Sequence, residues 1–137
     1  MMKINNNAFT LVEMIAVVAL ISILSGTAIM SVSNIVNKSK KKTYQNFEKN
    51  LKVAATNYIG KHPELVATSS QKLSATKLID EGYLETMVDP ANKSSNCNKN
   101  SYVTVYQKRA NGAFNIEMSY KICLVCSSYK TSSDCVK

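Results

Sequence analysis

Four cysteines are the residues of this sequence best suited to covalent chemistry. They are Cys97, Cys123, Cys126 and Cys135, all in the last third of the 137 residues. An even number of cysteines in a short exported domain is typical of a disulfide framework. The Cys123-x-x-Cys126 spacing also occurs in zinc sites, but structural zinc usually needs two such pairs or added histidines, and His62 lies far away. We therefore expect structural disulfides and no bound metal.

The other polar side chains form no catalytic pattern. With a single histidine, a nucleophile paired with a histidine base is implausible. There is also no glycine-rich phosphate loop. Asp89, with Glu85 and Asp80 upstream, is a weak calcium pattern, because calcium takes about 6–8 oxygen ligands. The Asp89-Pro90 pair is more typical of a turn. We expect neither an enzyme nor a cofactor.

Glu13 is the one charged residue in an apolar run over residues 9–36. The run has no proline, and its composition predicts an unbroken helix. Its 28 residues exceed the roughly 20 that span a bilayer core. A carboxylate in a membrane helix costs about 2.5–3.5 kcal/mol at the bilayer centre and less toward an edge. Glu13 is therefore expected to be functional, with a cation as its partner.

The charge of the chain is strongly positive, at +8. This charge favours contact with anionic surfaces such as nucleic acid, wall polymers or lipid headgroups, although scattered lysines usually serve solvation. The lysines cluster after the apolar run, at Lys38, Lys40, Lys41 and Lys42. That distribution alone places the following domain in the cytoplasm, whereas the cysteines favour an oxidising exterior.

The helix is expected to continue over residues 37–60 as an amphipathic helix. Apolar residues recur there at steps of three and four, at Tyr44, Phe47, Leu51, Ala54, Ala55 and Tyr58. Gly60 and Pro63 should end it. The remaining residues, 61–137, form a small globular head. A core of that size is marginal by itself, so disulfides would supply much of its stability.

The head is expected to begin with a loop over residues 62–71. A short helix over residues 75–81 should follow, with Ser74 as its N-cap and Gly82 as its stop signal. Strands are predicted over residues 102–109 and 113–125, because apolar residues alternate in both.

The pair Asn111-Gly112 between these strands predicts a two-residue hairpin loop. Ala110 then faces Ala113, and Val105 faces Met118, which matches the apolar faces. The chain as a whole is predicted to have an α+β fold, in which a long helix packs on a small antiparallel sheet.

The hairpin register favours one disulfide pairing among the three possible. Extended along both strands, the register places Cys97 opposite Cys126, at a separation close to disulfide range. Cys123 then pairs with Cys135. Pairing Cys123 with Cys126 is disfavoured, because residues three apart in a strand point to opposite faces. The second choice is Cys97 with Cys123 and Cys126 with Cys135.

The N-terminal stretch has a distinctive arrangement: a short basic leader, the small residue Ala8, then Phe-Thr-Leu-Val-Glu and the apolar run. This arrangement resembles the class III signal of type IV pilins and of the pseudopilins of type II secretion and competence systems. The family usually has glycine at the position of Ala8. Many members also have a helix-breaking proline near the position of Met30.

The resemblance implies processing and assembly roles for three residues. A membrane-embedded prepilin peptidase would cut between Ala8 and Phe9, remove the leader of residues 1–8, and N-methylate Phe9. In the family, the new amine pairs with the glutamate of a neighbouring subunit during filament assembly, and Glu13 holds the matching position here. The implied fold is pilin-like, with residues 9–36 as its transmembrane and filament-core helix.

The resemblance also implies partners and a location. The partners are the prepilin peptidase, other pilin subunits, the membrane and, indirectly, an assembly ATPase and a platform protein. The precursor would cross the cytoplasmic (inner) membrane once with its head outside, and the mature chain would join a cell-surface filament. The motif outweighs the lysine distribution, because long domains translocate largely regardless of charge.

Two other functions stay open at this point. One is a binding protein, carried by the pilus, whose basic face captures DNA or another anionic surface. The other is a plain signal-anchored exported protein that never assembles. An ordinary secretory signal has an apolar core of about 7–15 residues with its cleavage site after it, so the longer run here favours the pilin-like interpretation.

Overall fold

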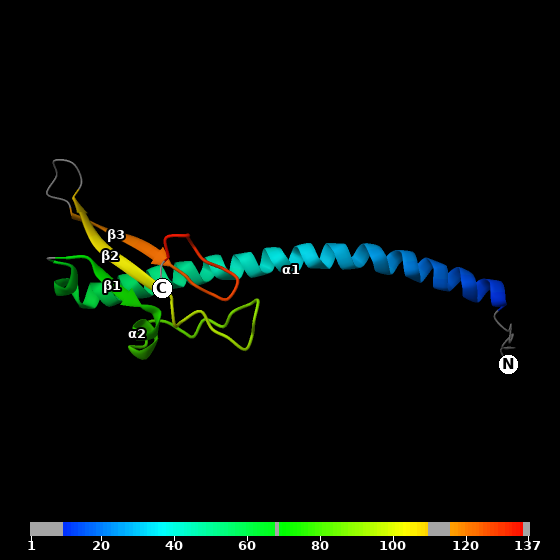
Figure 1. The fold of residues 1–137 in the computed structure, drawn as a ribbon, viewed down its shortest axis with the longest axis horizontal. Helices are drawn as coiled ribbons and strands as arrows, with labels where there is room; N and C mark the ends of the chain where they lie inside the picture. Colours follow the sequence, from blue (N-terminus) through cyan, green and yellow to red (C-terminus); the bar gives the residue numbers. More distant parts are fainter. Residues whose placement is uncertain (1–9, 68, 110–115, 136–137) are drawn as a thin grey trace, which may run out of the picture. The chain divides into compact units, whose positions relative to one another are not determined.

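The computed structural model describes residues 10–67, 69–109 and 116–135, without the side chains of residues 25–30 and 109. Its elements are α1 (Leu11–Lys61), the 3-10 helix η1 (Pro63–Val66), β1 (Gln71–Ser74), α2 (Ala75–Asp80), β2 (Tyr102–Arg109) and β3 (Ile116–Cys123) (Figure 1). The chain divides into two compact units, Met1–Ser39 and Lys40–Lys137. The predicted α+β, pilin-like fold class is confirmed: the long helix is combined with a three-stranded antiparallel sheet. Two disulfides join the loop before β2, the end of β3 and the segment after β3.

In the first unit, every described side chain of α1 is exposed, in all directions around the helix. The large apolar ones are Leu11, Val12, Met14, Ile15, Val17, Val18, Leu20, Ile21, Ile23, Leu24, Val32, Ile35 and Val36. Within the described part of the chain, no helix combines the length and the apolar character that crossing a membrane requires. The span expected over residues 9–36 stays a prediction.

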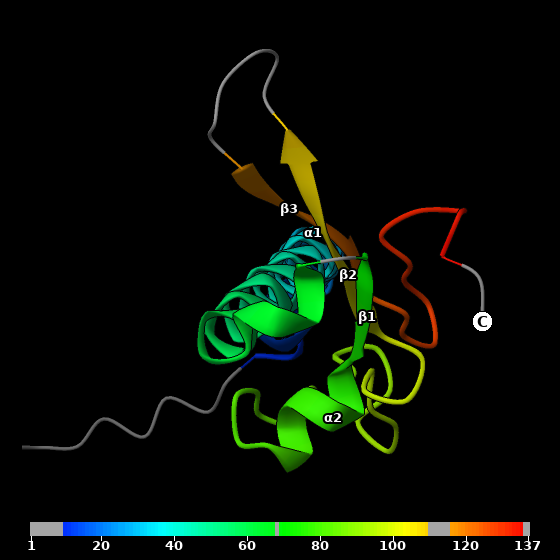
Figure 2. The same cartoon turned by 90° about the vertical axis from the view of Figure 1, so that its left-hand side faces the viewer.

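In the second unit, the apolar stripe of α1 forms one side of the core, as its spacing predicts. Tyr44, Leu51, Ala54, Ala55 and Tyr58 are buried, and Phe47 is partly buried against them. The other side of the core comes from the sheet and its continuation, through Leu73, Val103, Val105 and Leu124. Figure 2 shows the three strands beside this part of α1.

The sheet has the order β1-β2-β3, with both neighbouring pairs antiparallel. Strand β2 has the predicted bounds, and β3 falls within the predicted range. The expectation of a plain loop over residues 62–71 was wrong, because η1 and the start of β1 lie there. The sequence pattern does not predict β1, because this strand is short and has one buried residue, Leu73, among polar neighbours.

The predicted register of the β2–β3 hairpin was wrong by two residues. Val105 faces Tyr120, not Met118, and Arg109 faces Ile116. The Asn111-Gly112 loop lies outside the described residues. A shift of two residues keeps every side chain on its predicted face, because the period of a strand is two. The predicted core face of β3 is therefore correct, and Met118 packs against the core.

The short helix α2 begins as its sequence indicates. The Ser74 hydroxyl accepts a hydrogen bond from the backbone N–H of Lys77 at 3.2 Å, which is the N-cap arrangement. Gly82 follows the helix with a positive φ of 80°. This left-handed conformation favours glycine, and it turns the chain so that the Tyr83 N–H reaches the Leu78 carbonyl at 2.8 Å.

Candidate functional site

Glu13 lies in the first turn of α1, which begins directly after Thr10. The Thr10 hydroxyl accepts a hydrogen bond from the Glu13 backbone N–H at 3.3 Å. The Glu13 carboxylate in turn accepts from the Thr10 backbone N–H and from the Thr10 hydroxyl, each at 3.4 Å. This is a reciprocal capping box, which satisfies backbone donors at the helix start. The Thr-x-x-Glu spacing of Thr10 and Glu13 is the signal of this motif in the sequence.

The capping box holds the carboxylate at the exposed beginning of the helix. The positive end of the helix dipole lies there and favours a negative side chain. The predicted processing residues, Ala8 and Phe9, lie outside the described residues, so the cut between them stays a prediction. The assembly role of Glu13 also stays a prediction.

The head is joined by two disulfides, Cys97–Cys126 and Cys123–Cys135, with Cα–Cα separations of 4.5 and 5.6 Å. These are the two pairs that the predicted hairpin register favours. All four cysteines are buried. The zinc alternative for Cys123 and Cys126 has no support here, because each sulfur is bonded to another cysteine.

Strand register is not what brings the first pair together, however. Cys97 does not extend the ladder of β2, which begins only at Tyr102. The chain turns between them, and the Ser101 hydroxyl holds the turn by donating to the Cys97 carbonyl and accepting from the Val125 N–H. Cys97 reaches Cys126 through this turn rather than through strand register.

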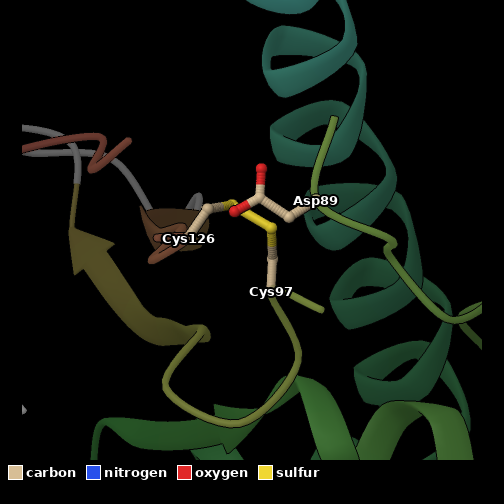
Figure 3. Close-up of side chains that lie close together, drawn as sticks. All are labelled: Asp89, Cys97 and Cys126. Carbon is tan, nitrogen blue, oxygen red and sulfur yellow. A yellow bond between two sulfur atoms is a disulfide. The ribbon is translucent and has the colours of Figure 1, made fainter. Parts of the chain in front are cut away.

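Asp89 lies beside the Cys97–Cys126 disulfide and is fully buried (Figure 3). One carboxylate oxygen accepts hydrogen bonds from the Tyr44 hydroxyl and the Ala91 backbone N–H, both at 2.8 Å. The other accepts from the Ser127 backbone N–H at 2.9 Å and from the Ser127 hydroxyl. A single carboxylate therefore joins α1, the loop after α2 and the segment after β3.

These hydrogen bonds determine the charge of Asp89. Burial of the carboxylate acts to raise its pKa, but the donors from Ser127, Ala91 and Tyr44 favour the ionised form more strongly. Together they lower the pKa of Asp89 from 3.8 to about 2. Burial and the adjacent carboxylate also raise the pKa of Tyr44, so its hydroxyl stays protonated and keeps donating.

The pattern of possible metal ligands around Asp89 does not form a metal site. Its carboxylate and the sulfurs of Cys97 and Cys126 lie within 4.8 Å of one another. The two sulfurs are bonded together, and the carboxylate oxygens already accept hydrogen bonds from protein donors. Among the described residues, the weak calcium pattern of Asp80, Glu85 and Asp89 forms no such cluster either. Asp89 therefore has a structural role, in which it joins three segments by hydrogen bonds. The sequence pattern favoured only a turn at this position.

A second carboxylate fixes the same C-terminal segment to α1. Glu48 accepts hydrogen bonds from the hydroxyls of Tyr129, at 2.8 Å, and Thr131, at 2.7 Å. Burial, together with the hydrogen bond and the charge of Glu48, raises the pKa of Tyr129 to about 12. The two donors lie 81 and 83 residues from Glu48 in the sequence, so no local sequence pattern reveals these hydrogen bonds.

Comparison with known proteins identifies the N-terminal part of the chain. Residues 3–29 match the family model of the prokaryotic N-terminal methylation motif. No curated protein and no solved structure gives a significant match. The match covers Glu13, the capping box and the beginning of the exposed apolar helix. The chain thus carries, over residues 3–29, the prepilin-type N-terminal methylation signature of type IV pilins.

Proposed function

We propose that the mature chain is a structural subunit, a pilin or pseudopilin, of a type IV pilus, competence or type II secretion-like filament. In this proposal the prepilin peptidase cuts before Phe9 and methylates its amine. The motif points to a structural protein rather than an enzyme. The head would then form the outer part of the filament, and the first half of α1 its core.

The observation that carries the proposal is the exposed apolar surface of α1 within the matched motif. Large apolar side chains such as Leu11, Ile15 and Val18 are 78%, 61% and 62% exposed. Burying each of them removes roughly 1.5–3 kcal/mol of unfavourable contact with water. A helix that is apolar all round is normally buried against lipid or other helices. Bundled subunits provide that burial, first from lipid and then from one another.

Glu13 supplies the polar part of this assembly. Its carboxylate lies at the helix beginning, close in sequence to the amine that cleavage before Phe9 creates. Unit charges about 4 Å apart attract by about 4 kcal/mol at an effective dielectric constant of 20. The amine of one subunit and Glu13 of its neighbour would therefore neutralise each other within the apolar bundle and set the axial position of the incoming subunit.

The disulfides support an extracytoplasmic head. Buried structural disulfides such as Cys97–Cys126 form and persist in oxidising compartments. We therefore place the head outside the cytoplasmic membrane before assembly and on the cell surface afterwards. The other pilin subunits, the assembly ATPase and the platform protein are the partners in this proposal.

Two substitutions separate the charge of Glu13 from its capping role. Glu13→Gln keeps a capping side chain, since glutamine also completes the capping box, but removes the charge. Thr10→Ala removes the cap and keeps the charge. We expect filaments to be absent with Glu13→Gln, as with Glu13→Ala, and present with Thr10→Ala. The measurement is an immunoblot of the sheared filament fraction, with the cell-associated chain as the control for expression.

Normal filaments from the Glu13→Gln variant would contradict the charge-pairing role. Mass spectrometry of the N-terminus tests processing separately. An N-methylated Phe9 start is expected, whereas an intact Met1 start on the cell-associated chain would favour the plain signal anchor.

A further inference from the structure

The face of the sheet that turns away from α1 is polar, basic and aromatic. Val103 and Val105 of β2 are buried in the core, so the residues that alternate with them, and those paired beside them, lie on the opposite face. We call this surface the outer face. Its described residues are Lys72 and Ser74 of β1, Tyr102, Thr104, Tyr106 and Lys108 of β2, and Glu117, Ser119, Lys121 and Cys123 of β3. Cys123 is buried and bonded to Cys135, so the open part of the outer face begins beyond it, toward Tyr106.

The charges of the outer face favour an anion. Lys72 and Lys121 both pair with Thr104, one from each neighbouring strand. Strands lie about 4.8 Å apart, so the two lysines flank Thr104 at about 10 Å from each other. Lys108 adds a third exposed cation along β2. The outer face thus has three lysines and one carboxylate, that of Glu117, and its net charge is positive.

Two tyrosines lie along the same strand as these lysines. Tyr102 and Tyr106 are four residues apart on β2, which separates them by about 13 Å. Tyr106 is 40% exposed. The Lys72 ammonium lies 3.8 Å from the centroid of the Tyr102 ring. This is a cation–π contact, so the charge and the aromatic ring lie next to each other on the outer face.

We propose that the outer face binds single-stranded nucleic acid. Lysines in a row neutralise phosphates, and exposed aromatic rings stack on bases, which is how single strands are bound without sequence preference. Lys72, Lys121 and Lys108 would contact the phosphates, and Tyr106 would stack on a base. The tyrosines favour a single strand over a duplex, because the bases of a duplex are stacked on each other and have no free face. This function is independent of filament assembly.

The test is fluorescence anisotropy of the full chain in a neutral detergent, with a labelled oligothymidylate of about 16 nucleotides as the probe. We expect binding that weakens steeply between about 50 and 200 mM salt. Tyr106→Ala should weaken binding about tenfold, whereas Tyr106→Phe, which keeps the ring, should restore most of it. Lys121→Gln should lower the salt slope by about 0.7, the loss of one phosphate contact with a single strand.

Lys52→Gln is the matched control, because Lys52 is an exposed lysine on α1 and its loss changes the net charge equally. It should leave affinity and salt slope nearly unchanged. Equal effects of Lys52→Gln and Lys121→Gln would overturn the proposal by showing diffuse attraction. Three other results would overturn it: no binding at low salt, no effect of Tyr106→Ala, or competition by polyphosphate as strong as by unlabelled oligothymidylate. Circular dichroism of each variant verifies the fold.

Discussion

The ring of Tyr44 in α1 stacks on the ring of Tyr129, with centroids 4.4 Å apart and ring planes 4° from parallel. The two residues are remote in sequence, and their contact holds the segment after β3 against the helix. The hydrogen bond from the Tyr129 hydroxyl to Glu48 strengthens the same attachment. The contact between these two rings is therefore one of the places where the head can be loosened by a single substitution.

Substitutions of Tyr129 should separate these two contributions. Tyr129→Phe keeps the stacked ring but loses the hydrogen bond to Glu48, at a cost of about 1.5 kcal/mol for a bond to a charged group. Tyr129→Ala loses the ring as well and should cost about 3 kcal/mol, the low end of the range for truncating a buried aromatic side chain, because Tyr129 is only partly buried. Thermal unfolding followed by near-ultraviolet circular dichroism measures both. Equal losses in the two variants would show that the stack contributes nothing.

Asp89 should make the free energy of unfolding of the head depend on pH in the acidic range. Its folded pKa of about 2 is below its ordinary value of 3.8. The stability that it contributes is therefore fully present above about pH 4 and is lost as the pH falls through the folded pKa. The shift corresponds to about 2 kcal/mol. Melting temperatures between about pH 5 and pH 2 should fall in the native chain.

The Asp89→Asn variant provides the comparison. Asparagine cannot accept all four hydrogen bonds, so this variant should melt lower at neutral pH. It should also lose much of the acid dependence, because the group no longer titrates. An unchanged acid dependence in Asp89→Asn would assign the effect to other carboxyls.

Removal of each disulfide should destabilise the head by an amount that follows loop length. The pair Cys97–Cys126 spans 29 residues, and Cys123–Cys135 spans 12. The chain-entropy relation gives a loss of about 4 kcal/mol for the first and about 3 kcal/mol for the second. Denaturant unfolding of the Cys97→Ser/Cys126→Ser and Cys123→Ser/Cys135→Ser double variants measures this. A larger loss from the shorter loop would contradict the entropic account.

The pairing itself is checked by peptide mapping without reduction. Trypsin leaves Cys123 and Cys126 on one peptide, because no lysine or arginine separates them. A second cleavage with chymotrypsin after Leu124 is therefore required. A peptide linking Cys126 to Cys97 is expected, and one linking Cys126 to Cys135 would refute the pairing.

Two glycines should respond to alanine with opposite signs. Gly60 lies in α1, and an added Cβ would meet nothing within 4 Å. Gly60→Ala should therefore stabilise the helix by up to about 1 kcal/mol. Gly82 has equal space but a φ of +80°, so Gly82→Ala should cost about 1 kcal/mol or more. Melting temperatures that shift in the same direction would refute the backbone explanation.

The sequence is sufficient to predict the features that depend on periodicity. The stripe from Tyr44 to Tyr58 and the alternation in β2 each repeat with the period of their element, so the buried faces were predicted correctly. The register of β2 with β3 was not predicted correctly, because the prediction depended on one turn signal, Asn111-Gly112. A two-residue shift leaves the same residues on each face, so hydrophobic pattern alone cannot detect it.

The hydrogen bonds of the buried Asp89 could not be predicted from the sequence. Asp89 binds Tyr44 and Ser127, which are 45 and 38 residues away, and no short motif links positions so far apart. The pair Cys97–Cys126 was predicted through an extended strand but is reached through a turn held by Ser101. The predicted pairing of these two cysteines is therefore the observed one, but a turn and not a paired strand brings them together.

The attachment of the C-terminal segment has a consequence for biosynthesis. Cys97 and Cys123 both await partners made after them, Cys126 and Cys135. The ribosome adds about 5–20 residues per second, so Cys97 waits about 1.5–6 s for its partner Cys126, which lies 29 residues later. During this interval Asp89 and Glu48 also lack Ser127 and Tyr129. The head therefore closes only late in synthesis, and an oxidant that acts early would favour the wrong partner, Cys123, for Cys97.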